Sequence, residues 1–148
     1  QNFLESSQRR AIVSAINRID SREWIPRHTF DHNDLWLGNV MLPGVSRERS
    51  ETGYPFVLID WPGANVFGHG IYDLLRISRE LKLSSTALRH ELIRHSEALK
   101  CTLIDTRSHL LASLARLHQH LECWPESQYI RVFHDCWNQL QSALNDPV

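Results

Sequence analysis

Apolar residues recur at helical spacing at the start of the chain. Between residues 3 and 20 they fall three or four positions apart, which predicts one amphipathic helix. Its apolar face consists of Leu4, Ala11, Ile12, Ala15, Ile16 and Ile19. The pattern ends at Trp24-Ile25-Pro26, because proline cannot continue helical hydrogen bonding and disfavours helix in the residue before it. Residues 27–31 are then expected to be extended.

The same helical spacing returns in the second half of the chain. One helix is predicted over residues 71–81, and three more follow Ser84. The first of these three has Leu88, Leu92, Leu99 and Leu103 on its apolar face, the second begins near Thr106 with Leu110, Leu114, Leu117 and Leu121, and the third follows Pro125 with Ile130, Phe133, Trp137, Leu140 and Leu144. Each helix has one apolar stripe, so the helices must pack on one another or on the segment before them.

Two short apolar runs between these helical regions predict strands, and the first is short enough to be a buried strand. The first is Val40-Met41-Leu42, and the second, Phe56-Val57-Leu58-Ile59, stops at Asp60. Residues 43–55 between them are charged and have Pro and Gly at both ends, which predicts a long hairpin loop. Such a hairpin would place Asn39, before its first strand, close to Asp60, after its second. Residues 61–70 are rich in glycine and turn formers and are expected to form a turn.

These elements predict an α+β fold that is mainly helical, in one domain spanning residues 1–148. The chain has 148 residues, 42% of them hydrophobic, which is enough for one core. A net charge of -1 provides no basic footprint for nucleic acid, and no apolar run is long enough for a membrane span. The three cysteines, Cys101, Cys123 and Cys136, do not fit a secreted disulfide framework. We therefore expect a cytoplasmic protein without nucleic-acid or membrane partners.

Hard oxygen ligands gather near the predicted hairpin. Asn39 supplies an amide oxygen and Asp60 a carboxylate, a pair that suits Mg²⁺, which leaves its other coordination positions to water or substrate phosphates. Asp34 precedes Asn39 in a loop that contains Gly38, and it would be free to orient a hydroxyl and accept its proton. Phosphoryl transfer needs these groups, because the protein contributes mainly positioning and charge neutralisation to that reaction.

Three ordered motifs extend this pattern. They are His32-Asn33-Asp34-Leu35-Trp36-Leu37-Gly38-Asn39-Val40-Met41, then Leu58-Ile59-Asp60-Trp61, then Gly70-Ile71-Tyr72-Asp73-Leu74. At this spacing they resemble the catalytic half of the aminoglycoside phosphotransferase and choline kinase-like family, whose members have a protein kinase-like fold. The resemblance covers residues 25–78. It implies the C-terminal lobe of that fold, with a small β-hairpin that carries the catalytic loop.

The resemblance implies an ATP- and Mg²⁺-dependent kinase that phosphorylates a small-molecule hydroxyl. The implied roles are catalytic base for Asp34, brace of the catalytic loop for His32, Mg²⁺ ligands for Asn39 and Asp60, support beneath the loop for Asp73, and floor of the adenine site for Met41 and Ile59. Residues 1–82 would form the catalytic and metal-binding segment, and residues 83–148 the acceptor side. Two positions depart from the family pattern: Asn33 stands where glycine is usual, and Asp31 where an apolar residue is common.

The nucleotide-covering half of such kinases has no counterpart in the sequence. There is no Gly-rich phosphate loop, and neither lysine, Lys82 or Lys100, follows a strand of the kind that places a lysine over the phosphates. Since the chain also begins at Gln1 without an initiator methionine, we expect a piece of a longer protein that lacks the N-terminal lobe. Alone, it is expected to bind ATP weakly and to turn over little or nothing. Its helical half has no acidic excess, which favours a neutral or anionic acceptor over a polycation.

Each of these residues also has a structural interpretation. Asp34, Asn39 and Asp60 are common turn residues, Asp73 could cap the helix that begins near Tyr72, and Met41 and Ile59 could be core residues. A second conceivable metal site, for zinc, is formed by His118, His120, Cys123, His134 and Cys136. Surface histidines and core cysteines explain that set as well. The alternative function is a non-catalytic, kinase-derived helical binding module.

Overall fold

The structure is a computed structural model that describes residues 3–42, 56–119 and 125–145. In these ranges the chain is mainly helical with two small antiparallel sheets, which confirms the predicted α+β class. The helices are α1 (Ser6–Asp20), α2 (Ile71–Glu80), α3 (Ser85–Leu99), α4 (Leu103–His118) and α5 (Glu126–Asn145), with one short 3₁₀ helix, η1 (Leu37–Asn39). The strands are β1 (Thr29–Asp31), β2 (Val40–Met41), β3 (Val57–Leu58) and β4 (Asn65–Gly68).

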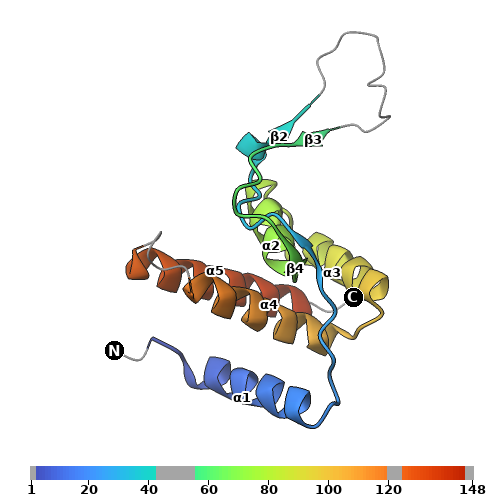
Figure 1. Ribbon diagram of the computed structural model, residues 1–148, viewed down its shortest axis with the longest axis vertical. Helices are drawn as coiled ribbons and strands as arrows, with labels where there is room; N and C mark the ends of the chain where they lie inside the picture. The colour runs from blue at the N-terminus through green and yellow to red at the C-terminus, as the bar shows by residue number, and fades with distance from the viewer. Residues whose placement is uncertain (1–2, 43–55, 120–124, 146–148) are drawn as a thin grey trace.

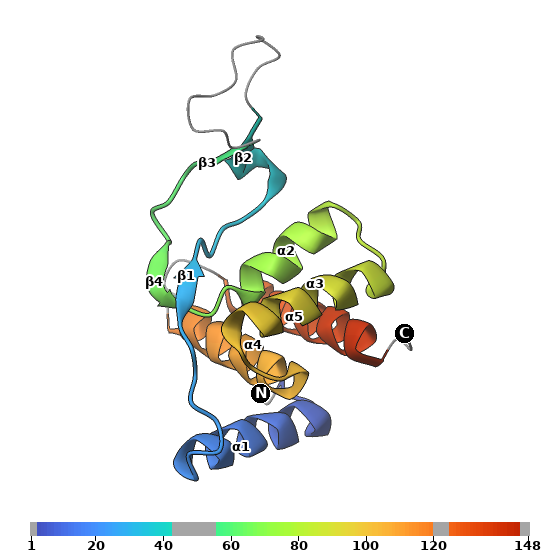
Figure 2. The same ribbon diagram turned by 90° about the vertical axis from the view of Figure 1, so that its right-hand side faces the viewer.

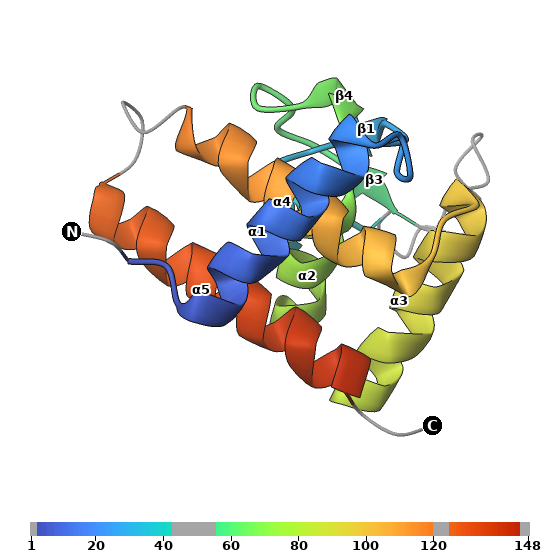
Figure 3. The same ribbon diagram turned by 90° about the horizontal axis from the view of Figure 1, so that it is seen from below.

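Helices α2 to α5 pack around one hydrophobic core, and α1 packs on α4 at the end of the molecule opposite β2 and β3 (Figures 1 and 3). The predicted stripe residues that are buried in this core are Leu88, Leu92, Leu110, Leu114, Phe133, Trp137 and Leu140. The helical interpretation of the second half is therefore confirmed. On α1, Ala15 is buried while Ile16 and Ile19 remain exposed. None of the helices in the described ranges is long and apolar enough to cross a membrane.

Leu99 and Leu103, predicted on one helix, belong to two. Helix α3 ends at Leu99 because Lys100 adopts a left-handed conformation, with φ of 51°, which cannot continue a right-handed helix. Thr102 then caps α4: its hydroxyl accepts a hydrogen bond from the N–H of Asp105, and the Asp105 carboxylate accepts one from the N–H of Thr102 at 2.7 Å. This reciprocal capping starts α4 at Leu103, earlier than predicted.

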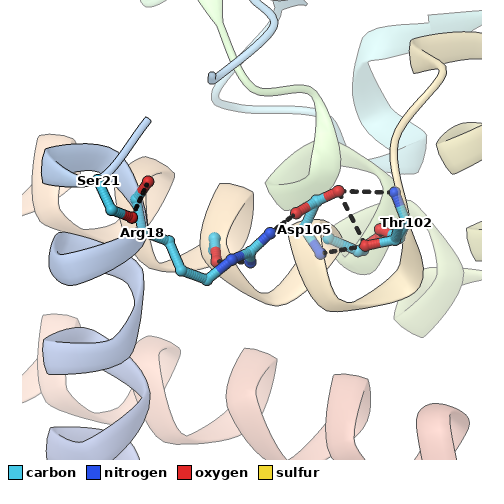
Figure 4. Close-up of polar contacts among 6 residues, drawn as sticks. Arg18, Ser21, Thr102 and Asp105 are labelled. Carbon is cyan, nitrogen blue, oxygen red and sulfur yellow. Dashed lines mark hydrogen bonds and ion pairs between the residues drawn. The ribbon is translucent and has the colours of Figure 1, made fainter. Parts of the chain in front are cut away.

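A partly buried ion pair connects α1 to the start of α4 (Figure 4). The guanidinium of Arg18 contacts one carboxylate oxygen of Asp105, and the other oxygen accepts hydrogen bonds from the N–H and hydroxyl of Thr102 at 2.7 and 2.8 Å. Burial by itself would raise the pKa of Asp105, but the hydrogen bonds from Thr102 and Arg18 bring that pKa below its usual range. The ionised carboxylate therefore joins the two helices.

The strands form two separate ribbons, of which β1–β4 lies against the helices (Figure 2). β1 pairs antiparallel with β4, and β2 pairs antiparallel with β3, with Val40 opposite Leu58. Residues 61–70 were expected to form only a turn, which is wrong for β4. This segment becomes a strand because β1 lies beside it in the fold, and local turn propensity does not encode that tertiary contact.

The β2–β3 ribbon extends away from the helical body (Figures 1 and 2). Its first strand was predicted to be buried, and this is wrong, since Met41 is 54% exposed; Val57 on the second strand is 51% exposed. The reason is that each strand has two residues and packs mainly on the other strand. The long loop predicted for residues 43–55 lies outside the described residues.

Candidate functional site

The loop that follows β1, residues 32–36, contains a residue with a left-handed backbone. Asn33 has φ of 63°, a conformation that glycine adopts freely and that asparagine tolerates better than most residues. Its side-chain amide donates hydrogen bonds to Asp31 Oδ1 and to the carbonyl oxygen of Gly63, both at 2.8 Å. The departure from glycine at this position is therefore compatible with the turn, and Asn33 links the 32–36 loop to the segment after β3.

Asp73 lies beneath the 32–36 loop and is 7% exposed. Its Oδ2 accepts a hydrogen bond from the backbone N–H of His32 at 2.5 Å. Burial raises the pKa of the Asp73 carboxyl, and the N–H of His32 opposes that shift by favouring the ionised form. The N-cap of α2 is Gly70, so the alternative that Asp73 is the helix cap is wrong. Its carboxylate instead supports the loop.

The imidazole of His32 connects the 32–36 loop to the end of β3. Its Nε2–H donates to the carbonyl oxygen of Ile59 at 2.9 Å, which places a proton on Nε2 because a carbonyl can only accept. The ring centroid lies 4.4 Å from that of Trp61. Since both the backbone N–H and the ring of His32 are bonded, this one residue positions the loop relative to α2 and to β3.

Asn39 lies at the base of the β2–β3 ribbon, and one hydrogen bond determines the orientation of its amide. Nδ2–H donates to the backbone carbonyl of Asp34 at 2.9 Å, which leaves Oδ1 as the atom that could bind a ligand. The backbone N–H of Ile59 donates to the Asn39 carbonyl at 3.0 Å. Asn39 and Asp60, the residue after Ile59, therefore lie at the same end of the ribbon, and the predicted hairpin pairing is confirmed for the backbone.

Asp60 also has a left-handed backbone, with φ of 64°. Residues other than glycine in this region are uncommon and cluster at functional sites. Its carboxylate is exposed and has no hydrogen-bond or ion-pair partner within residues 3–42, 56–119 and 125–145. A carboxylate and an amide oxygen suit Mg²⁺ when substrate phosphates supply further ligands. Over the same ranges, no group of three or more His, Cys, Asp or Glu side chains could hold a metal ion.

Asp34 opens onto a cleft with a volume of about 800 Å³. The cleft is lined by the 32–36 loop, the segment after β3, α2 and the facing ends of α4 and α5. The Asp34 side chain is 55% exposed, and its Oδ1 forms an ion pair with Nη2 of Arg76 at 3.2 Å. Arg76 also donates to the hydroxyl of Tyr72 at 3.2 Å. An accessible, oriented carboxylate thus borders a cleft whose size suits a small molecule.

Met41 and Ile59 lie on one face of the β2–β3 ribbon. Met41 is opposite Val57, and Ile59 lies two residues beyond Val57, so the alternation of side chains places them on the same side. Met41 is 54% and Ile59 is 36% exposed. The alternative that both are core residues is therefore wrong, because the ribbon extends beyond the helices that form the core.

Sequence reasoning missed a buried polar layer below the 32–36 loop. Asp31, which is 1% exposed, accepts the backbone N–H of His69 at 3.1 Å in addition to the Asn33 amide. Gly68 permits this approach, since a Cβ there would lie 1.8 Å from the Asp31 carboxylate. The buried rings of His69 and His109 share a hydrogen bond of 3.0 Å between their Nδ1 atoms, and burial lowers the pKa of each ring to about 4. Both rings are therefore neutral near pH 7.

Three residues of the conceivable zinc site are described, and each contacts a different part of the fold. His134 hydrogen-bonds to a glutamine on α1, and His118 packs edge-on against a tyrosine of α5. Cys136 is buried, and burial raises its pKa to about 12, which favours the thiol over the thiolate that binds metal. His120 and Cys123 lie outside the described residues. Contacts within the fold thus explain the three described residues.

Comparisons with models of protein families, with curated proteins and with solved structures find no match to this chain. Its function is therefore inferred from the contacts described above. Those contacts connect the three sequence motifs: Asp73 to the backbone of His32, the ring of His32 to Ile59, and Ile59 to Asn39.

Proposed function

We propose that this chain is the C-terminal catalytic lobe of a small-molecule kinase that transfers the γ-phosphate of ATP to a hydroxyl group. The observation that carries the proposal is the hydrogen-bonded connection from Asp73 through His32 and Ile59 to Asn39. Ordinary turn residues need neither a buried carboxylate beneath them nor a histidine that joins two segments. The motifs that resemble the aminoglycoside phosphotransferase and choline kinase-like family are also the segments that these hydrogen bonds join.

In the proposed reaction, the acceptor binds in the cleft beside Asp34. The Asp34 carboxylate accepts the proton of the acceptor hydroxyl while the hydroxyl oxygen forms a bond to the γ-phosphorus. The bond between the γ-phosphorus and the bridging oxygen breaks, and that oxygen leaves as part of ADP. The proton then passes from Asp34 to solvent. Arg76, whose Nη2 is 3.2 Å from Asp34 Oδ1, orients the carboxylate for this step.

The residues at the base of the β2–β3 ribbon fit the Mg²⁺ that such a reaction uses. Asn39 Oδ1 and the Asp60 carboxylate would bind the ion, which supplies neutralisation of the phosphate charge. Met41 and Ile59 would pack against the adenine ring. Because the sequence contains neither a Gly-rich loop nor a strand lysine, we propose that an N-terminal lobe supplies the rest of the nucleotide site.

Phosphoryl transfer by a protein that contains this chain together with a nucleotide-binding lobe tests the proposal. Asp34→Ala is expected to lower the rate by a factor of about 10²–10⁴, because it removes the general base. Its far-UV circular dichroism should not change, since the side chain is exposed. Asp135→Ala is the matched control, because Asp135 is also an exposed carboxylate paired with an arginine, Arg79, at 2.9 Å. An unchanged rate in Asp34→Ala would refute the assignment.

A non-catalytic helical binding module is the second candidate function. An apolar groove of about 340 Å³ favours it, because a groove of this composition suits an apolar ligand. Residues that line it include Phe3, Ile12, Ile16, Leu111 and Tyr129. Such a module has no need for Asp34, Asn39 and Asp60 together. The two functions are separated by the phosphoryl-transfer assay, since only the kinase loses activity on substitution of Asp34.

A further inference from the structure

The cleft beside Asp34 contains more positive than negative charge. Its charged lining residues are Asp34, Arg76 and Arg116, and its neutral polar ones include Asn33, Asn65 and Gln128. These side chains come from segments far apart in the sequence that converge on one volume of about 800 Å³. The cleft is thus large enough for a small molecule and has a net positive lining among its described residues.

The two arginines differ in their partners. The charge of Arg76 is already paired with Asp34 at 3.2 Å. Arg116 lies in the last turn of α4 and is partly buried, and its Nη1–H donates to the carbonyl oxygen of Phe67 at 2.9 Å. It forms no ion pair with any carboxylate of residues 3–42, 56–119 and 125–145. Within the described residues, the charge of Arg116 at the cleft is therefore not paired with a carboxylate.

Asp31, whose pKa is influenced by the charge of Arg116, does not use the remaining donors of that guanidinium. Burial raises the pKa of Asp31 and the charge of Arg116 opposes that shift, but the Asp31 oxygens accept hydrogen bonds from Asn33 and His69. A guanidinium has five N–H donors in a planar fork, and one of them is bonded to Phe67. The others have no partner among the described residues, so they could bind a ligand in the cleft.

We propose that the acceptor of this kinase carries an anionic group, a carboxylate or a phosphate, and that Arg116 binds this group while the acceptor hydroxyl lies at Asp34. This inference rests on the proposed function, since it names the acceptor class of the same site. A guanidinium binds either anion through paired N–H donors. Two arginines against one aspartate disfavour a cationic acceptor such as choline or an aminoglycoside.

Binding to this chain without ATP tests the acceptor class. The probes are glycerol, D-glycerate, sn-glycerol 3-phosphate and choline, which are similar in size and differ in charge. Binding is followed by ¹H–¹⁵N NMR at the backbone amides of Asn33, Gly63 and Gln128, which line the cleft. At least one of the two anions should shift these signals saturably, and glycerol and choline should not. Whichever of the two anions binds with the higher affinity shows whether the anionic group of the acceptor is a carboxylate or a phosphate. Equal shifts with glycerol, or shifts only outside the cleft, would overturn the proposal.

Substitutions identify the group that binds the anion. Arg116→Gln should weaken anion binding about tenfold or more, because a charge-assisted contact is lost. Arg94→Gln is the matched control, since it removes the same charge from exposed Arg94, which pairs with Glu91 at 3.3 Å on α3. It should change binding by less than about twofold, because salt screens distant surface charges. Equal weakening in the two variants would show an effect of total charge and overturn the proposal.

A second variant and a second assay complete the test. Arg116→Lys keeps the charge without the planar fork, so an intermediate affinity supports the proposal even if Arg116→Gln does not fold. Wild-type affinity in a folded Arg116→Gln protein overturns it.

If Asp34→Ala loses phosphoryl transfer but neither anion binds, the proposed function stands and the acceptor class is wrong. If the anions bind through Arg116 but Asp34→Ala turns over normally, the kinase assignment fails, and with it the role of Arg116 in acceptor binding.

Discussion

The contact between Asp73 and the backbone of His32 allows a quantitative test of how the 32–36 loop is supported. In Asp73→Ala, the N–H of His32, a residue that is 2% exposed, loses its acceptor. A hydrogen bond to a charged group contributes about 1.5–3 kcal/mol. The burial that raises the pKa of Asp73 offsets part of that contribution. We expect the free energy of unfolding to fall by about 2 kcal/mol, which is about a 30-fold change in the folded-to-unfolded ratio.

Urea unfolding followed by circular dichroism measures this difference, and the thermal midpoint should fall by about 4–8 °C. Asp135→Ala is the control, because its surface ion pair with Arg79 contributes at most about 1 kcal/mol. Amide hydrogen exchange locates the effect: the N–H of His32 should exchange faster in Asp73→Ala and at the wild-type rate in the control. Equal stability of the two variants, with the His32 amide still protected, would refute the supporting role of Asp73.

Two further substitutions test the pH dependence of stability. Arg18→Gln removes the ion pair with Asp105 and should lower the free energy of unfolding at pH 7 by about 1.5–3 kcal/mol. Because the pKa of Asp105 is below its usual range, this stabilisation is present above about pH 4 and lost as the pH falls further, so urea unfolding should show a smaller difference from wild type at pH 3. His109→Phe replaces a buried ring whose pKa is lowered to about 4. An unfolded histidine binds its proton near pH 6.5, so wild-type stability should decline as the pH falls from about 6.5 towards 4, and the variant should decline less over that window. An identical decline would contradict the burial of a neutral His109.

The helices could be predicted from the sequence because local spacing determines them. The leucines of α4 identify its buried face, and Leu110 and Leu114 are both 0% exposed. The boundary between α3 and α4, in contrast, could not be predicted from local spacing. The left-handed residue at the end of α3 is Lys100, whereas glycine is the residue that usually marks this position.

The formation and burial of the strands depended on tertiary contacts more than those of the helices did. The glycines beside β4 favoured a turn, and pairing with β1 made that segment a strand. A short apolar run predicts a strand but does not specify whether other elements cover it, which is why β2 was wrongly expected to be buried. The local sequence pattern thus located these segments but did not determine which other elements they pack against.

Some residues of the candidate site could likewise be predicted from the sequence, and others could not. Asp34, Asn39 and Asp60 could be selected from the sequence because their residue types and their order around a hairpin are local properties. Arg116 and the pair of His69 and His109 could not be selected, since nothing in their own segments distinguishes them from surface residues. By itself, the sequence determined which chemical groups are available and which helix faces are apolar. Only the tertiary structure decided which of those groups meet, because a contact across 40 positions, as between His69 and His109, depends on how whole elements pack.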